Sequence, residues 1–178
     1  MFPMRERESF SFSGPDLAPV LVVGYNRPNE IRRVLNRILE AEVSRLYVAL
    51  DGPQDSDDDR ALCDEVRSLV DEFANDIPTE VLLRQENFGC RAAVPAAIDW
   101  FFENEEYGVI LEDDTLPSLS FFGFATALLR RYEGDFRVMK ISGFNPLGAW
   151  DAHAGDYFFT NYSFSWGWAS WRRAWALH

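Results

Sequence analysis

The chain has 178 residues, of which 47% are hydrophobic and 15% aromatic, a composition typical of one globular domain with a sizeable core. Its formal net charge of −12 argues against nonspecific binding to nucleic acid or to an anionic membrane surface, because both need clustered Lys and Arg. Cys63 and Cys90 are too few and too far apart for a disulfide framework or a CxxC metal site, so we expect reduced thiols in a cytoplasmic protein.

The amino-terminal residues 1–17 alternate charged residues with Phe and Ser and lack the apolar core of a signal peptide. No stretch reaches the roughly 18 apolar residues that a membrane span requires. We therefore expect no membrane span, while peripheral association with a membrane complex stays open. We expect an amino-terminal arm over 1–18 and a single domain over 19–178.

Apolar runs alternate with segments of helical spacing through the first two thirds of the chain. The runs at 19–24, 46–50, 81–83 and 107–111 predict buried strands, and the segments between them predict helices, the first of which opens at Pro28. Strands that alternate with helices predict a mostly parallel central sheet covered on both faces, which is a Rossmann-like three-layer α/β/α architecture. The carboxyl ends of the strands should then meet along one edge of the sheet.

The last third of the chain is less regular. We predict a helix around 121–132 and a strand over 137–142. Trp168, Trp171 and Trp175 stand at i, i+3 and i+7, which predicts a helix that runs toward His178. The final residues carry neither Gly nor Pro to close that helix, so we expect the natural chain to continue past His178.

Three carboxylates, Glu112, Asp113 and Asp114, follow directly on the apolar run at 107–111. A buried strand delivers such a triplet to the rim of the sheet, where ligands of open α/β folds bind. Adjacent negative charges there need a counter-charge, and a hydrated Mg²⁺ or Mn²⁺ that carries a diphosphate supplies one. The alternative is a solvated turn with spare charge.

Polar residues also follow the other predicted strands. Arg27 can meet a diphosphate at the start of the helix opened by Pro28, or it can pair with Glu30. Asp51 can accept from the N–H of a pyrimidine base, or it can close a turn through its own backbone. Arg91 lies in the first turn of its helix, against the preference set by the helix dipole, and this placement favours a ligand-binding role.

Several common site types are absent from the sequence. His153 and His178 have no second His or Cys at ligand spacing, so we interpret both as bystanders. The chain has no Gly-x-Ser-x-Gly elbow, no P-loop lysine motif and no GxGxxG, which disfavours hydrolases, P-loop nucleotidases and dinucleotide oxidoreductases. The tryptophans suit a core, and their faces also suit stacking on sugar rings.

Taken together, these motifs resemble those of nucleotide-diphospho-sugar glycosyltransferases of the GT-A fold, and their order looks most like N-acetylglucosaminyltransferase I and related family 2-like bacterial enzymes. The resemblance covers 19–178, with Glu112-Asp113-Asp114 as a variant of the DxD motif. The segments that carry it are Pro19 to Arg27, Asp51-Gly52, Asn87 to Trp100, Val109 to Asp114, Phe121-Phe122, Ile141 to Asn145 and Ser165 to Trp168.

The resemblance implies roles for the acidic triplet and the loops before it. Asp114 would bind Mn²⁺ or Mg²⁺ on the donor diphosphate, Asp113 the ribose, and Glu112 the hydroxyls of the donor sugar. The loop Tyr25-Asn26-Arg27 would contact the donor, with Arg27 on the phosphate, and Asp51 would hold a uracil.

The resemblance extends to residues outside that triplet. Arg91 would match a basic residue near the diphosphate, and Ser142 and Asn145 would line the donor site. Trp166 and Trp168 would lie on the acceptor side. Inverting relatives take a catalytic carboxylate from further downstream, so Asp151 and Asp156 are only weak candidates for the base, and we expect the base to lie beyond the end of this chain.

The function that these features imply is metal-dependent transfer of a sugar from a nucleoside diphosphate donor, a UDP-sugar by resemblance, to an acceptor hydroxyl of a saccharide or another molecule, with inversion. One alternative is a non-catalytic or degenerate nucleotide-sugar-binding module. A sugar-nucleotide pyrophosphorylase on a similar fold is disfavoured, because no Gly-rich, Lys-containing loop follows the first predicted strand.

Overall fold

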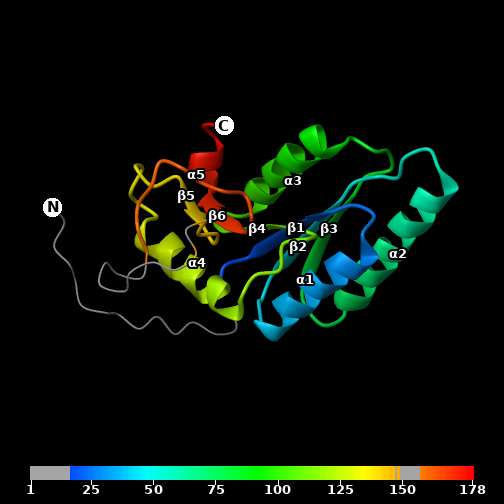
Figure 1. Cartoon of the computed structure of the whole chain (residues 1–178), viewed down its shortest axis with the longest axis horizontal. Helices are drawn as coiled ribbons and strands as arrows, with labels where there is room; N and C mark the ends of the chain where they lie inside the picture. The colour runs from blue at the N-terminus through cyan, green and yellow to red at the C-terminus, as the bar shows by residue number, and fades with distance from the viewer. Residues whose placement is uncertain (1–16, 147, 149–156) are drawn as a thin grey trace.

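A single six-stranded sheet with the order β3-β2-β1-β4-β6-β5 organises the computed structural model (Figure 1). The structure describes residues 17–146, 148 and 157–178. The strands are β1 (Val20–Gly24), β2 (Leu46–Leu50), β3 (Thr79–Leu83), β4 (Tyr107–Glu112), β5 (Lys140–Ser142) and β6 (Trp168–Trp171). The first four are mutually parallel, and β6 runs antiparallel to both β4 and β5.

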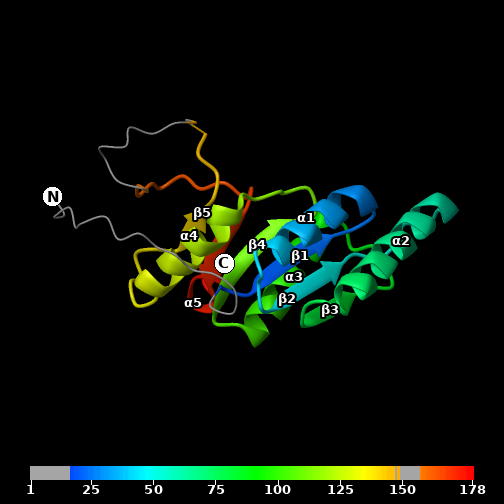
Figure 2. The same ribbon diagram turned by 90° about the horizontal axis from the view of Figure 1, so that it is seen from below.

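Helices cover both faces of this sheet. They are α1 (Pro28–Glu40), α2 (Asp57–Phe73), α3 (Cys90–Asn104), α4 (Leu119–Arg131) and the short α5 (Arg172–Trp175). One apolar cluster joins the sheet to α1, α2 and α4, and a second joins the opposite face to α3. Figure 2 shows the layers from below. The predicted three-layer α/β/α class with a mostly parallel sheet is confirmed.

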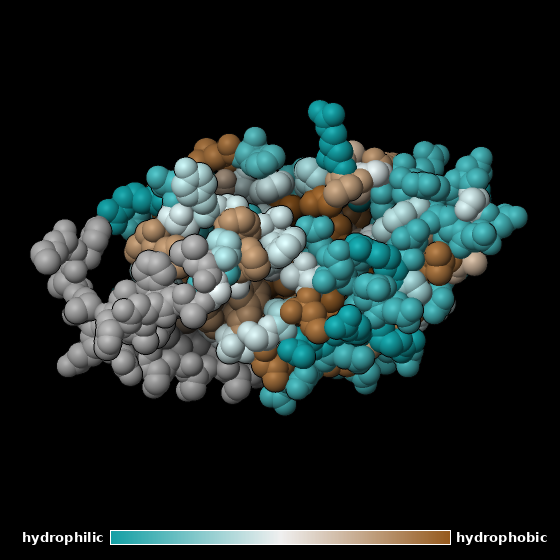
Figure 3. All heavy atoms as spheres, in the orientation of Figure 1, coloured by the Kyte–Doolittle hydropathy of each residue, from teal (hydrophilic) through white to brown (hydrophobic). Residues whose placement is uncertain are grey.

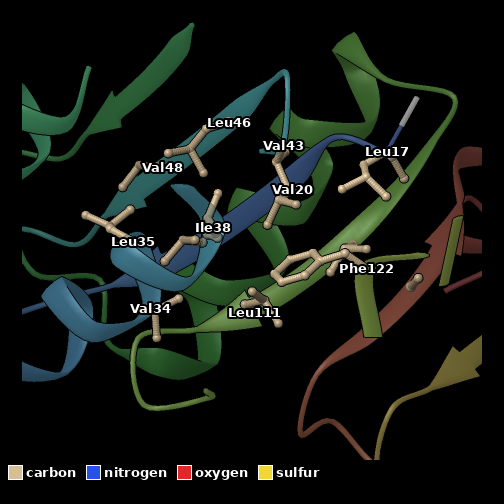
Figure 4. Close-up of a cluster of buried hydrophobic side chains, with 14 of the residues drawn as sticks. Leu17, Val20, Val34, Leu35, Ile38, Val43, Leu46, Val48, Leu111 and Phe122 are labelled. Atoms are coloured by element: carbon tan, nitrogen blue, oxygen red, sulfur yellow. The ribbon is translucent and has the colours of Figure 1, made fainter. Parts of the chain in front are cut away.

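The alternation of side chains along β1 explains how one short strand supports both layers. Val20 and Val22 enter the cluster of α1, α2 and α4, whereas Leu21 and Val23 enter the cluster of α3. All five residues of β1 are buried, which is typical of a parallel strand covered on both faces. Figure 4 shows Val20 among Leu111, Phe122 and Ile38, contributed by β4, α4 and α1.

The predicted helix through Trp168, Trp171 and Trp175 is wrong over its first half. Residues 168–171 form β6, and only Arg172–Trp175 is helical. In a strand Trp168 and Trp171 point to opposite faces, and Trp171 is buried with its indole N–H donating to the carbonyl of Leu129 at 3.1 Å. Pairing with β4 and β5 therefore overrides the helical spacing of the tryptophans.

The first described residues of the chain already belong to the folded domain. Leu17 and Ala18 are buried in the core, and the backbone N–H of Ala18 donates to Thr126 Oγ1 at 2.8 Å. No helix in the described part of the chain is long and apolar enough to cross a membrane. The surface over α2, at the right-hand end of the molecule, is mainly hydrophilic (Figure 3).

Candidate functional site

The order of strands reverses between β1 and β4. The chain passes from β1 outward to β2 and β3 on one side, and then returns to add β4 on the other side of β1. A crevice forms at the carboxyl ends of two such strands, where the following loops diverge, and ligands of open α/β sheets bind there. The loop after β1 and the acidic triplet after β4 meet at this point.

Arg27 joins these two loops. Its guanidinium donates to Asp113 through Nε at 3.3 Å and through Nη2, and to Asp114 through Nη1 at 2.8 Å. Its ion pairs in the described chain are with these carboxylates and not with Glu30, so the local alternative for Arg27 is wrong. Arg27, Asp113 and Asp114 are called the clamp below.

The two aspartates of the clamp differ in environment. The side chain of Asp113 is 3% exposed and also accepts from the N–H of Tyr25 at 3.4 Å, whereas the side chain of Asp114 is 50% exposed. Burial raises the pKa of Asp113, and the hydrogen bond and charge of Arg27 oppose that shift. Asp113 therefore fixes the position of Arg27, and Asp114 presents its carboxylate to solvent.

Glu112 is the least compensated member of the triplet. Partial burial, followed by the negative charges of Asp114 and Asp113, raises the pKa of Glu112 above its ordinary value of 4.5. Arg27 lowers it by less than these effects raise it. Glu112 lies at the edge of the crevice, where a hydrogen-bond donor on a ligand would stabilise its ionised form.

Asp51 closes turns, which is one of the two alternatives predicted for this residue. Its carboxylate accepts from the backbone N–H groups of Gly52 at 3.0 Å, Phe88 at 3.0 Å and Gly89 at 2.9 Å. The turn after β2 is thus tied to the turn after β3. A Cβ on Gly52 would lie 2.4 Å from the backbone of Glu86, so only glycine fits between these turns.

Tyr25 and Asn26 are held by Asp59, a residue that sequence reasoning did not single out. The Tyr25 hydroxyl and the Asn26 amide donate to opposite oxygens of Asp59, each at 2.5 Å. Burial, followed by the hydrogen bond to Asp59, raises the pKa of Tyr25 to about 12. Asp59 belongs to the acidic first turn of α2, whose charges the helix dipole already explains, so its sequence position gave no distinctive signal.

Two pockets flank the clamp. A pocket of about 280 Å³, here called the β1-side pocket, contains five of the predicted donor residues. Those residues are Tyr25, Arg27, Asp51, Glu112 and Asp113. A pocket of about 500 Å³, here called the α4-side pocket, begins at Asp114 and is bounded by Phe121, Phe144 and Trp166. The acidic triplet therefore runs from one pocket into the other.

Some predicted site residues lie outside these pockets. Arg91 is exposed at the start of α3 and is not among the lining residues of either pocket. Trp166 lines the α4-side pocket, but Trp168 does not, because it lies in β6 with the Lys140 ammonium 4.2 Å from its ring centroid. Asp151 and Asp156 lie outside the described residues.

Ser142 and Asn145 border the α4-side pocket without lining it. The Ser142 hydroxyl is within 3.4 Å of both the N–H and the carbonyl oxygen of Phe144, and Asn145 Nδ2 donates to the carbonyl of Gly148 at 3.1 Å. Their hydrogen bonds shape the loop that carries Gly143 and Phe144 into the pocket wall.

The described residues contain no group of three or more His, Cys, Asp or Glu side chains that could hold a metal ion by themselves. Asp114 nevertheless fits a different kind of site, because Mg²⁺ and Mn²⁺ commonly take one or two carboxylates and complete their coordination with substrate phosphates and water. The half-exposed carboxylate of Asp114 could supply one such ligand.

No protein-family model and no curated protein matches the chain. Among solved structures, a mannosyltransferase from Pyrobaculum calidifontis, determined in complex with GDP-Man and Mn²⁺, superposes with a TM-score of 0.50 at 18% identity. The match covers 76% of this chain and 39% of that chain, so this chain spans about two fifths of that protein's length. A 4-diphosphocytidyl-2C-methyl-D-erythritol synthase matches at 12% identity over 91% of this chain and 80% of that one, with a TM-score of 0.39.

The first of these likenesses concerns the fold. The chain shares a Rossmann-like α/β fold with that mannosyltransferase, and its polar crevice lies at the switch point between β1 and β4.

Proposed function

We propose that the chain is a glycosyltransferase that moves a sugar from a nucleoside diphosphate donor to an acceptor hydroxyl. The observation that carries this proposal is the clamp, in which Arg27 spans Asp113 and Asp114 at the switch point, between two pockets. A cation paired with carboxylates at that place suits a ligand that brings both a diphosphate and a divalent metal ion.

The two pockets suit the two substrates. The β1-side pocket takes the nucleotide, with Asp51 near the base, the loop of Tyr25 and Asn26 along the donor, and Arg27 at the diphosphate, beside the amino terminus of α1. Glu112 and Asp113 face the sugar and ribose hydroxyls. The acceptor enters the α4-side pocket, where the exposed ring of Trp166 offers a face for stacking.

Asp114 would hold Mn²⁺ or Mg²⁺, and the ion would stabilise negative charge on the departing diphosphate. The Arg27 guanidinium pairs with Asp114 at this position. When a donor binds, the guanidinium exchanges Asp114 for a phosphate oxygen and keeps its hydrogen bonds to the buried Asp113. The base that deprotonates the acceptor and the inverting stereochemistry are expected from the resemblance to N-acetylglucosaminyltransferase I-like enzymes.

Two nucleotides are candidates for the donor. The motif resemblance favours UDP, whereas the mannosyltransferase with the similar fold was determined with GDP-Man. Because Asp51 already accepts three backbone hydrogen bonds, it has little capacity left to select a base. A panel must therefore include both nucleotides.

Thermal unfolding with UDP, GDP, CDP and ADP, each with Mn²⁺ and with excess EDTA, tests the proposal. A ligand at ~100 times its dissociation constant stabilises by about 2.7 kcal/mol, so a clear rise in Tm is expected for at least one nucleoside diphosphate with Mn²⁺. No shift with any of them would reject the donor site. Equal shifts in EDTA would reject the metal, and binding without release of nucleoside diphosphate from sugar donors would favour the non-catalytic module.

A further inference from the structure

β3 is an edge strand with exposed apolar side chains. It has β2 as its neighbour on one side and stands at the end of the sheet order on the other (Figure 2). Val81 is 36% exposed and Leu83 is 42% exposed, although both face the layer of α1 and α2. An uncovered edge of this kind is a template for pairing with another strand.

The hydrogen bonds to β2 determine which backbone groups of β3 remain available. Leu46 N–H donates to the carbonyl of Pro78 at 3.0 Å, and Arg84 N–H donates to the carbonyl of Leu50 at 3.1 Å. Successive residues of a strand alternate in direction, so the even-numbered residues from 78 to 84 turn toward β2. The N–H and C=O groups of residues 79, 81 and 83 therefore point away from the sheet.

The side chains along this edge are chemically self-complementary about Leu82. Glu80 precedes it by two residues and Arg84 follows it by two, and Val81 and Leu83 flank it. We propose that β3 pairs antiparallel with β3 of a second copy of the chain, with the two-fold axis at Leu82, so that the two sheets become one. This proposal concerns assembly and does not depend on the proposed function.

In that register the pairs agree in both chemistry and backbone geometry. Glu80 of each copy lies opposite Arg84 of the other, and Leu82 lies opposite its own symmetry mate, all in the closer, non-hydrogen-bonded positions. Val81 and Leu83 lie opposite each other at the hydrogen-bonded positions, where their outward N–H and C=O groups are exchanged.

Arg84 is already held on the face that the pairing needs. It donates to the carbonyl of Ala93 at 3.2 Å, and its guanidinium lies 5.0 Å from the centroid of the Phe88 ring. Glu80 lies on the same face, where its carboxylate is 3.5 Å from the Tyr47 hydroxyl. Partial ordering before association lowers the entropy lost when the two charges meet.

Other registers are less favourable. A two-fold axis at Val81 would place the charged Glu80 opposite the apolar Leu82 and would leave Arg84 without a counter-charge. An in-register parallel pair would place Glu80 against Glu80 and Arg84 against Arg84, and like charges directly opposite each other are destabilising. The register about Leu82 avoids both conflicts.

Sedimentation velocity of the full chain, over a roughly hundredfold range of protein concentration, tests the proposal because a dimer dissociates on dilution. We expect wild type to dimerise and Glu80→Arg or Arg84→Glu to raise the dissociation constant by about tenfold or more, since each change acts twice across the two-fold axis. The double variant Glu80→Arg/Arg84→Glu should restore dimerisation, because the opposite charges face each other again.

A backbone variant tests the edge independently of charge. Val81→Pro removes an outward N–H but leaves the ladder to β2 intact, so it should give a folded monomer. Leu119→Glu, at a similarly exposed apolar residue on α4, is the matched control and should remain dimeric. A wild type that stays monomeric throughout, or a dimer that survives Val81→Pro in a protein with an unchanged unfolding transition, overturns the edge pairing. Failure of the double variant to recover overturns the register.

Discussion

The side chain of Asp114 is far more accessible to water than that of its neighbour Asp113. The Asp114 side chain is 50% exposed and pairs with an Arg27 side chain that is 47% exposed. Exposed pairs of this kind contribute ~0–1 kcal/mol to folding. Removal of the Asp114 charge should therefore affect ligand binding far more than stability.

We predict that Asp114→Asn abolishes the Mn²⁺-dependent part of the nucleotide-induced rise in Tm and lowers the free energy of unfolding by less than about 1 kcal/mol. Titration of nucleotide with and without Mn²⁺, followed by urea denaturation, measures both quantities. Asp71→Asn, an exposed residue near the far end of α2, is the control and should bind like wild type. Loss of cooperative unfolding in Asp114→Asn would show that the carboxylate is structural.

The raised pKa of Glu112 predicts how the stability of the protein depends on pH. Its pKa in the folded protein is raised above 4.5, first by burial and then by the charges of Asp114 and Asp113. The wild-type protein therefore loses stability as pH rises through that raised pKa, because the folded state resists losing the proton. Glu112→Gln lacks this loss. It should unfold like wild type at pH values below the ordinary pKa of 4.5 and be more stable than wild type at neutral pH.

Urea denaturation of wild type and Glu112→Gln at a series of pH values from acid to neutral measures this difference. Glu65→Gln, on the exposed face of α2, controls for the loss of one negative charge from an acidic protein. A difference that is independent of pH, or a Gln variant that is less stable at neutral pH, would contradict the assigned environment of Glu112.

At the scale of elements, the turn after β2 and the turn after β3 form one unit through Asp51. Sequence reasoning left open whether Asp51 holds a base or closes a turn. We predict that Asp51→Ala lowers the free energy of unfolding by about 2–4 kcal/mol, because three buried or partly buried N–H groups lose a charged acceptor. Asp55→Ala, in the same loop but in an exposed pair with Arg60, should cost less than about 1 kcal/mol.

Chemical denaturation and nucleotide titration of these two variants separate the alternatives. If Asp51→Ala unfolds like wild type but no longer binds nucleotide, then Asp51 contacts the ligand directly, and the turn does not need it. If both stability and binding fall together, the carboxylate supports the pocket through the backbone.

The elements that the sequence predicts well are those with a local signal. The buried strands β1, β2 and β4 appear as continuous apolar runs, and Pro28 marks the first turn of α1. β6 could not be predicted in this way, because its residues pair with β4, about 60 positions earlier in the chain, and its tryptophans also fit a helix. A strand stabilised mainly by distant partners leaves little trace in its own sequence.

The candidate site also combines features with a local sequence signal and features that depend on distant residues. Polar residues after each strand predict the position of the crevice, and Arg27 and Asp113 are found in it. Their hydrogen bond joins residues 86 positions apart, and the bond of Tyr25 to Asp59 joins residues 34 apart, so neither pairing follows from local spacing. The residue types are visible in the sequence, and their partners depend on the topology.

At the scale of the whole molecule, the sheet should open from its edges. β1 and β4 each have a strand on both sides and apolar layers on both faces, whereas β3 and β5 are edges. We predict that amide hydrogens of β1 and β4 exchange with solvent most slowly, near the rate set by global unfolding, and that the outward amides of β3 exchange fastest among the parallel strands. Hydrogen exchange followed by NMR at low protein concentration measures this, and slower exchange at Val81 than at Val22 would contradict the arrangement.

The late position of β6 in the chain has a consequence for the order in which the protein is completed during synthesis. The lining of the β1-side pocket is supplied by residues 23–113, which span β1 to β4 and the helical crossovers between them. The α4-side pocket needs Trp166 and Gly167, and the segment that carries them is held only when β6 inserts between β4 and β5. Because the chain leaves the ribosome from its amino terminus, every residue that lines the β1-side pocket emerges before Trp166 and Gly167 do. A nascent chain of this protein therefore contains all the residues proposed to hold the nucleotide before it contains the wall proposed for the acceptor.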